Sequence, residues 1–181
     1  MARISYTVPG LDDDQSSTVI TTLQKRLSAY NDLHLTLKHV HWNVVGPHFI
    51  AVHEMIDPQV DLVRGYADEV AERIATMGGS PRGTTGSIVA DRDWDDYDIG
   101  RDGVLAHLAA LDLVYVGVIT DNRTAIEAFG AIDPVTEDVL IGQTAELEKF
   151  QWFIRAHLED IGGQLAHAGT HTEKQAAAAA R

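Results

Sequence analysis

The chain has 181 residues, a mass of 19.8 kDa and a formal net charge of −13. Its length suits one domain, and 45% hydrophobic with 23% charged residues is the composition of a folded protein. The acidic excess disfavours general binding to DNA or anionic membranes, and the absence of cysteine excludes disulfides, zinc–thiolate sites and iron–sulfur clusters. A metal ion would have to be bound by Asp, Glu and the nine His.

The amino-terminal segment, from Met1 to Asp14, lacks the apolar core of a signal peptide and ends in three aspartates. No stretch of the sequence approaches the roughly 20 apolar residues of a membrane span. We therefore expect a cytoplasmic protein, with association with the nucleoid as an additional option.

Proline and glycine divide the chain into four long intervals, each with apolar residues at a helical period. Three predicted helices cover about 16–42, 49–77 and 101–129. The fourth opens with Asp133 followed by Pro134, an N-cap residue and a first helical position, and ends before Gly162. Helices of this length indicate an all-α fold, a four-helix bundle.

The remaining segments are the connection between helices two and three and the two ends of the chain. The connection between helices two and three is long, and residues 94–99 are a candidate for a short extra helix within it. No strand shows convincing alternation. Residues 1–15 form an amino-terminal extension, 16–162 the bundle, and 163–181 a small, polar, alanine-rich tail that we expect to be mobile. The alanines at 176–180 are compatible with a short helix or with disorder.

One face of the second predicted helix carries an unusual set of polar residues. At 100° per residue, four of them fall within about 100° of one another. They are His53, Asp57, Asp68 and Glu72. A solvated acidic face is the ordinary explanation for such a stripe. The histidine and the interspersed alanines favour instead a packed, metal-binding surface.

The spacing of these residues limits how they could bind one metal ion. The pair His53 and Asp57 lies roughly 22 Å along the helix axis from the pair Asp68 and Glu72. A single helix cannot unite both pairs, whereas a two-fold-related antiparallel copy can. The sequence therefore predicts two equivalent metal sites at a homodimer interface. A di-iron site inside one bundle is not available, because no His has a Glu three residues before it.

The segment at residues 41–57 closely resembles the signature of the Dps family, the ferritin-like DNA-binding proteins from starved cells. The run from Asp68 to Arg73 continues the resemblance, and Phe150-Gln151-Trp152-Phe153 is similar to the family's aromatic motif on the last helix. The resemblance implies a ferritin-like four-helix bundle that assembles into a hollow shell of twelve subunits. It spans about 23–158, most of the chain.

The resemblance also implies an iron-oxidising centre between two-fold-related subunits. By position, His41, His53 and Asp57 of one subunit and Asp68 and Glu72 of its neighbour would bind two iron ions per centre. Similar proteins oxidise Fe(II), preferably with hydrogen peroxide, and store Fe(III) as an oxide mineral.

Other residues receive roles through the same resemblance. Trp42 stands where the family has a tryptophan beside the iron centre, which is thought to intercept products of one-electron oxidation. For Trp152 we favour a plain core position. Asp138, with Glu137 beside it, matches an acidic pore through which iron enters. Both carboxylates would equally be stabilised by the helix dipole alone.

The sequence gives little support for DNA binding through basic tails. Arg3 stands against three aspartates at 12–14, and Lys174 and Arg181 against Glu173. Since each tail neutralises few phosphates, we expect weak or absent DNA binding at neutral pH. Two tail histidines, His167 and His171, would add positive charge below about pH 6.5.

The second predicted helix allows more than one interpretation. Pro58 inside the second helix predicts either a local kink or a shifted helix start. The segment from His53 to Asp57 also resembles a zinc-protease helix whose second histidine is replaced, so a metal-dependent hydrolase with Glu54 as base is one alternative. A DNA-compacting scaffold is another, and a bundle with a merely solvated acidic face is the plainest.

Overall fold

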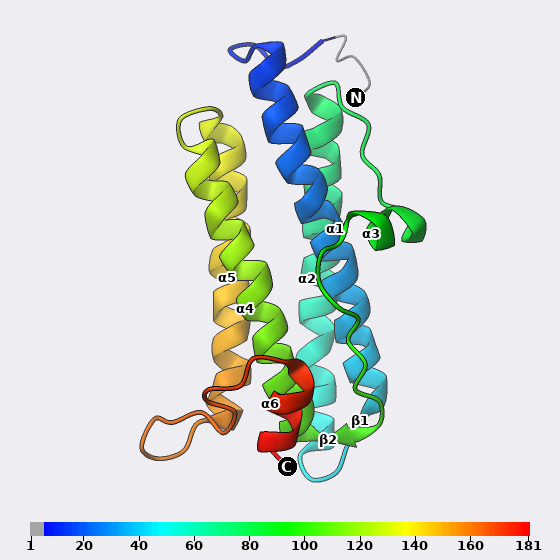
Figure 1. Ribbon diagram of the computed structural model, residues 1–181, viewed down its shortest axis with the longest axis vertical. Helices are drawn as coiled ribbons and strands as arrows, with labels where there is room; N and C mark the ends of the chain where they lie inside the picture. Colours follow the sequence, from blue (N-terminus) through cyan, green and yellow to red (C-terminus); the bar gives the residue numbers. More distant parts are fainter. Residues whose placement is uncertain (1–5) are drawn as a thin grey trace.

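The computed structural model describes residues 6–181 and consists mainly of four long helices (Figure 1). These helices are α1 (Asp13–Asn43), α2 (Phe49–Thr76), α4 (Val104–Phe129) and α5 (Pro134–Leu158). Helices α1 and α2 form one antiparallel hairpin and α4 and α5 a second, and the two hairpins pack together. The predicted all-α, four-helix architecture is confirmed.

Two of the long helices, α1 and α5, begin where the local sequence marks a helix start. Asp12 and Gln15 form a capping box at the start of α1: the Gln15 amide donates to the Asp12 carboxylate at 2.8 Å, and the Asp12 amide donates to Gln15 Oε1 at 3.0 Å. This places the helix start at Asp13, slightly earlier than predicted. Helix α5 begins as predicted, with Asp133 at its N-cap and Pro134 in its first turn.

Pro58 does not mark a new helix start, because α2 continues through it from Phe49 to Thr76. The proline removes one backbone hydrogen bond within the helix, and its ring is exposed. One uninterrupted helix therefore carries both polar pairs, so their separation along the axis is real.

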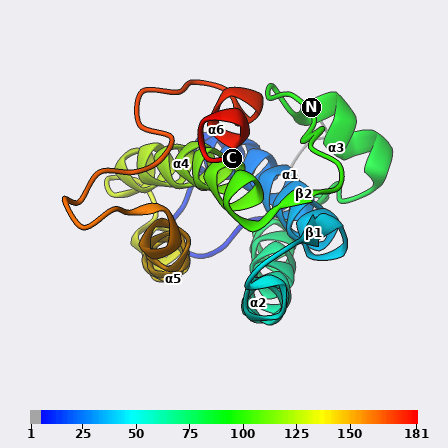
Figure 2. The ribbon, with the colours of Figure 1, turned by 90° about the horizontal axis from the view of Figure 1, so that it is seen from below.

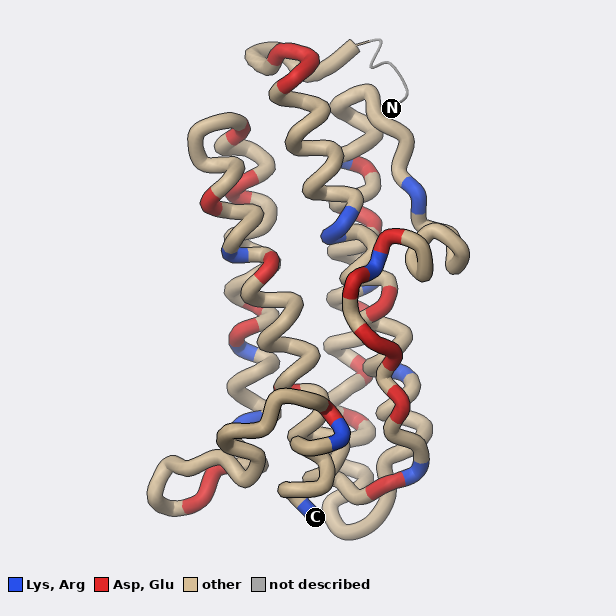
Figure 3. The backbone as a smooth tube through the Cα atoms, viewed as in Figure 1, with Lys and Arg blue, Asp and Glu red and all other residues tan. Residues whose placement is uncertain are grey.

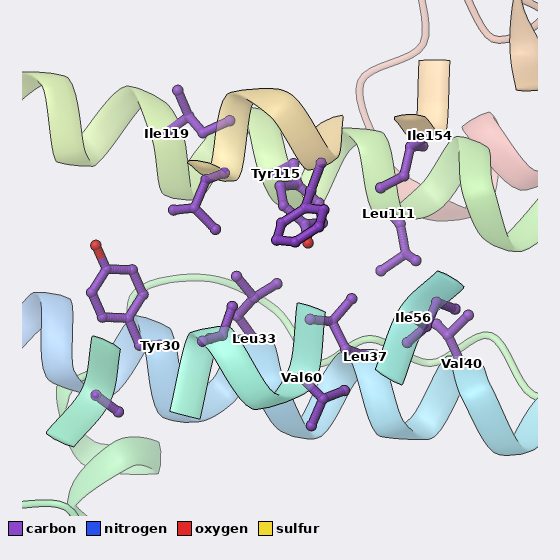
Figure 4. Close-up of a cluster of buried hydrophobic side chains, with 14 of the residues drawn as sticks. Tyr30, Leu33, Leu37, Val40, Ile56, Val60, Leu111, Tyr115, Ile119 and Ile154 are labelled. Atoms are coloured by element: carbon purple, nitrogen blue, oxygen red, sulfur yellow. The ribbon is translucent and has the colours of Figure 1, made fainter. Parts of the chain in front are cut away.

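The core lies between the two hairpins (Figure 4). Fully buried side chains come from all four long helices; they include Leu33, Leu37, Ile56, Leu111, Tyr115 and Ile154. Tyr115 is buried with its hydroxyl donating to Gln59 Oε1 at 2.6 Å, so the polar atom is satisfied.

Helix α4 is long and apolar enough to span a membrane. However, 56% of its most apolar 18-residue stretch is buried inside the protein, as in a core helix.

The long connection between α2 and α4 contains the expected short helix, but at a different place. Helix α3 covers Thr85–Asp91, whereas residues 94–99 are not helical. The prediction for 94–99 was wrong because tertiary contacts hold this stretch: Trp94 Nε1 donates to Asp32 Oδ2 of α1 at 2.7 Å, and Ile99 O lies 2.8 Å from His39 Nε2.

Two very short strands, which the sequence pattern did not predict, join the two hairpins. Strand β1 (Val44–Val45) pairs in parallel with β2 (Asp102–Gly103). The pair ties the turn after α1 to the start of α4, next to the predicted metal ligands.

The carboxyl-terminal segment contains α6 (Glu173–Ala179), which packs across α4 (Figure 2). Ala176 and Ala177 are buried there. A second anchor is His167, whose Nε2 lies 3.0 Å from Asp112 Oδ2, with both side chains almost fully buried. Small side chains and a buried polar pair thus hold parts of residues 163–181 against the bundle, and the mobility predicted for this tail stays untested by these contacts.

Acidic residues are spread over both hairpins and are concentrated along the connection that precedes β2 (Figure 3). Asp93, Asp95, Asp96 and Asp98 are all exposed in this stretch. The negative charge of the chain is therefore presented to solvent, where it attracts cations.

Candidate metal centre

Two predicted ligands meet where α1 ends and α2 begins. His41 lies in the last turn of α1 and His53 in the second turn of α2. Their rings stack with centroids 3.6 Å apart and planes inclined by 23°. The reversal between the helices uses Gly46 and His48 with φ of 96° and 65°, and His48 is the one non-glycine residue with positive φ among residues 6–181.

Each imidazole is oriented by the backbone of the other residue. His41 Nδ1 lies 3.0 Å from the carbonyl oxygen of His53, and His53 Nδ1 lies 3.0 Å from the carbonyl oxygen of His41. A carbonyl oxygen only accepts hydrogen bonds, so each Nδ1 carries the proton and donates. In the neutral rings the lone pair then resides on Nε2, the form in which histidine binds metals.

Asp57 lies beside the His41 ring; we refer to His41, His53 and Asp57 as the half-site, which by itself is not arranged to hold a metal. Its Oδ1 lies 3.2 Å from His41 Nδ1 and 2.8 Å from Lys38 Nζ. The hydrogen bond from Lys38 holds the pKa of the Asp57 carboxyl below its usual value, and His41 acts in the same direction. The carboxylate is half exposed and ionised at neutral pH, so it is able to bind a cation.

Asp68 and Glu72 lie further along α2, both exposed. Within residues 6–181 neither carboxylate forms an ion pair or a side-chain hydrogen bond, and no group of three His, Asp or Glu in this part of the chain is arranged to hold a metal. A complete site on one chain is absent from the described residues. The inter-subunit arrangement stays a prediction.

The two candidate tryptophans are both on the surface. Trp42 is 71% exposed, with Lys38 Nζ 5.9 Å from its ring centroid. Trp152 is 63% exposed, so the core position expected for it was wrong. It lies two residues from the buried Phe150 and from the buried Ile154, and two residues turn a helix by roughly 200°, away from the core.

The two candidate pore residues lie in the first turns of α5. Glu137 is half-buried against Gly130, and Asp138 is exposed. Both positions fit carboxylates near a helix amino terminus, and a pore role stays a prediction.

Comparison with known proteins decides the family. The family described as ferritin-like domain matches residues 20–163. A relative from Mycolicibacterium smegmatis, named DNA protection during starvation protein, is 68% identical over 177 residues, covering 98% of this chain and 97% of the relative. The chain belongs to the Dps family.

Solved Dps structures agree with this assignment. The structure of Mycobacterium smegmatis Dps superposes with a TM-score of 0.92 at 69% identity, covering 94% of this chain and 97% of the other. A Dps protein from Streptomyces coelicolor gives a TM-score of 0.89 at 64% identity, covering 91% and 98%.

The Dps signature pointed to His41, His53 and Asp57, and the structure brings these three together. It did not point to Lys38, which contacts the same carboxylate. The available signal was helical spacing, since Lys38 precedes His41 by three residues and Trp42 by four and so shares their side of α1.

Proposed function

We propose that this Dps protein oxidises Fe(II) at centres formed between two-fold-related subunits and stores the Fe(III) product inside a hollow shell. The observation that carries the proposal is the half-site at the α1–α2 junction. It brings the rings of His41 and His53 together, each with Nδ1 held by a backbone carbonyl and Nε2 left to bind a metal, and it sets the Asp57 carboxylate against the His41 ring. Imidazole and carboxylate together form a donor set that suits non-haem iron.

The remaining donors come from a second copy in this proposal. Asp68 and Glu72 are an i, i+4 pair of like charges on one exposed helix face, which is unfavourable without a cation between them. They have no internal partner within residues 6–181. An antiparallel neighbour would place them opposite His41, His53 and Asp57, and the two-fold axis would produce two such centres.

Hydrogen peroxide is the oxidant that best fits a two-iron centre. Each Fe(II) gives up one electron, the O–O bond breaks, and the two electrons and two protons yield two water molecules. Pairing two Fe(II) with one peroxide avoids release of a hydroxyl radical, which would account for protection from oxidative stress. Iron is the substrate in this scheme, and the protein supplies its position and its counter-charges.

The family relationship and the negative charge of the chain support a shell. We propose the twelve-subunit assembly of similar Dps proteins, and twelve chains would carry a formal charge of about −156. Such a container attracts Fe(II) and suits cation storage. Glu137 and Asp138 are the proposed acidic entry for iron.

Binding to DNA is not part of the proposed function. Both basic residues of the tail are already paired within the chain: Lys174 Nζ lies 2.5 Å from Asp98 Oδ2, and Arg181 Nε lies 3.1 Å from Asp102 Oδ2. His167 is buried against Asp112, so it does not face a polyanion. Arg3 lies outside the described residues.

Stopped-flow absorbance tests the proposal directly. The iron-free protein is mixed with two Fe(II) per subunit and then with peroxide or, separately, with oxygen. We expect rapid oxidation by peroxide that is lost in His41→Ala and in Asp68→Ala. Oxidation no faster than in buffer alone would refute the proposal.

An assay with Zn²⁺ and an activated ester tests the hydrolase alternative. In that alternative, Glu54→Gln would abolish turnover of the ester.

A further inference from the structure

Lys38 occupies a position that the iron chemistry does not require. Its ammonium lies 2.8 Å from Asp57 Oδ1, the same oxygen that lies 3.2 Å from His41 Nδ1. The lysine reaches this carboxylate from α1, across the α1–α2 junction. In the iron-free chain a cation therefore already sits against a predicted iron ligand.

A divalent ion and this ammonium cannot share the Asp57 carboxylate without cost. A doubly charged metal ion and the singly charged ammonium, about 5 Å apart, repel each other even in a water-like dielectric. The two cations also compete for the same Oδ1 lone pairs. Iron binding at Asp57 thus requires that the lysine move away.

The Trp42 ring lies close enough to receive the lysine head group if it leaves Asp57. Lys38 Nζ already lies 5.9 Å from the ring centroid of Trp42, which is one turn further along α1 and 71% exposed. The face of an indole ring attracts an ammonium ion. Because the Lys38 side chain is 28% exposed, rotation of its flexible stem toward the indole and solvent does not disturb the core.

We propose that Lys38 is an internal competitor that neutralises Asp57 in the iron-free protein and transfers to the Trp42 ring when a divalent ion binds. This inference rests on the proposed iron centre. In this role Lys38 weakens metal affinity, and it favours divalent ions over monovalent ones, because a singly charged ion gains too little from Asp57 to displace an equally charged ammonium. Lys38 is a specificity-determining residue and not an iron ligand.

Metal titration of the assembled, iron-free protein separates the possible roles of Lys38. Isothermal titration with Zn²⁺ and with Co²⁺ compares the wild type with Lys38→Gln, which removes the charge, and Lys38→Arg, which keeps it. We expect Lys38→Gln to bind both ions roughly tenfold more tightly, the factor that the lost repulsion implies. Lys38→Arg should bind no more tightly than wild type, since its guanidinium also pairs with carboxylate.

Tryptophan fluorescence supplies a readout that does not depend on turnover. Metal binding should change the Trp42 emission in the wild type, because the ammonium approaches the indole. The change should be absent in Trp42→Phe, and Lys38→Gln should lose most of it while still binding metal.

The outcomes distinguish this inference from the proposed function. Weaker or unchanged metal binding by Lys38→Gln would overturn the competitor role, since it would show that the lysine positions Asp57 or is inert. If the wild type binds no divalent ion and Asp57→Asn behaves identically, the iron centre itself fails. Tighter binding by Lys38→Gln, lost again in the Lys38→Gln/Asp57→Asn double variant, is the predicted result.

Discussion

His41 and His53 hold each other in position through reciprocal hydrogen bonds, with each Nδ1 3.0 Å from the other residue's carbonyl oxygen. The same two bonds join the end of α1 to the start of α2. The hydrogen bonds that connect the two helices are thus the same bonds that orient the two histidine rings. Because the acceptors are backbone carbonyls, these bonds hold the proton on each Nδ1 and leave each Nε2 free.

The first prediction concerns metal affinity. His41→Ala removes a ligand and the ring that stacks on His53, while the backbone carbonyl that orients His53 remains, so Zn²⁺ affinity should fall by about 100-fold or more. His39→Ala is the matched control, because its Nε2 lies 2.8 Å from Ile99 O and its ring points to the other side of α1. Isothermal titration measures both. Equal losses in the two variants would contradict the assignment.

The second prediction concerns a buried ion pair that secures the start of α5. Arg73 Nη2 lies 2.8 Å from Asp133 Oδ2, and the Asp133 side chain is 5% exposed. Breaking a buried pair leaves an unpaired charge, so Asp133→Asn should lower the free energy of unfolding by about 3 kcal/mol at neutral pH. Denaturant unfolding of both proteins provides the measurement.

The same pair predicts a pH dependence. Burial alone would raise the pKa of Asp133, but hydrogen bonds from Thr136 and Arg73 outweigh it and hold the pKa below its usual value. A lowered carboxyl pKa contributes stability above the unfolded pKa of about 3.9, and that contribution disappears as pH falls through the folded pKa. The difference between wild type and Asp133→Asn should be constant from pH 7 to 5 and shrink below pH 4. A difference that grows on acidification would refute this.

The third prediction concerns the carboxyl-terminal segment. His167→Ala removes the buried contact with Asp112, so amide hydrogens at 163–180 should exchange about tenfold faster while those of α5 keep their protection. His171→Ala, an exposed residue in the same segment, is the control and should leave exchange unchanged. Complete exchange of this segment in the wild type within seconds would show a mobile tail instead.

The fourth prediction concerns DNA. In a gel-shift assay at neutral pH and about 150 mM salt the wild type should not retard linear DNA, since its tail cations are paired and each tail offers few charges. Asp98→Asn/Asp102→Asn frees Lys174 and Arg181 and should retard DNA at low salt. Asp61→Asn/Glu127→Gln makes the same change in net charge elsewhere on the surface. Equal retardation by both double variants would mean that net charge alone is responsible.

The sequence predicted most of the bundle because long helices with Gly and Pro breaks depend on local signals. Helix α5, from its Asp133 cap to the segment before Gly162, is an example. The predicted extra helix at 94–99 failed because Trp94 and Ile99 are held by α1, a contact that no local pattern reveals. Docking of α6 likewise could not be predicted locally, because it depends on small side chains of α4 that lie far from α6 in the sequence.

The residues of the candidate site were likewise predictable from the sequence only in part. Helical spacing and the Dps signature led to His41, His53 and Asp57, and these three lie together in the structure. The role of Lys38 depends on a contact across two helices, which spacing on α1 alone does not establish. Residue type alone predicts a core position for Trp152. Its spacing of two residues from the buried Phe150 and Ile154 instead turns its side chain away from the core.

Mixing two inactive variants tests the inter-subunit centre most directly. One variant carries His53→Ala/Asp57→Asn and the other Asp68→Asn/Glu72→Gln, so each alone should lack rapid Fe(II) oxidation by peroxide. In a mixed dimer one of the two interface sites is intact, and random pairing of equal amounts should restore about a quarter of the wild-type rate. Recovery near this value, after the variants are co-expressed, is the result predicted here. No recovery above either variant alone, with the shells assembled, would contradict a site shared between subunits.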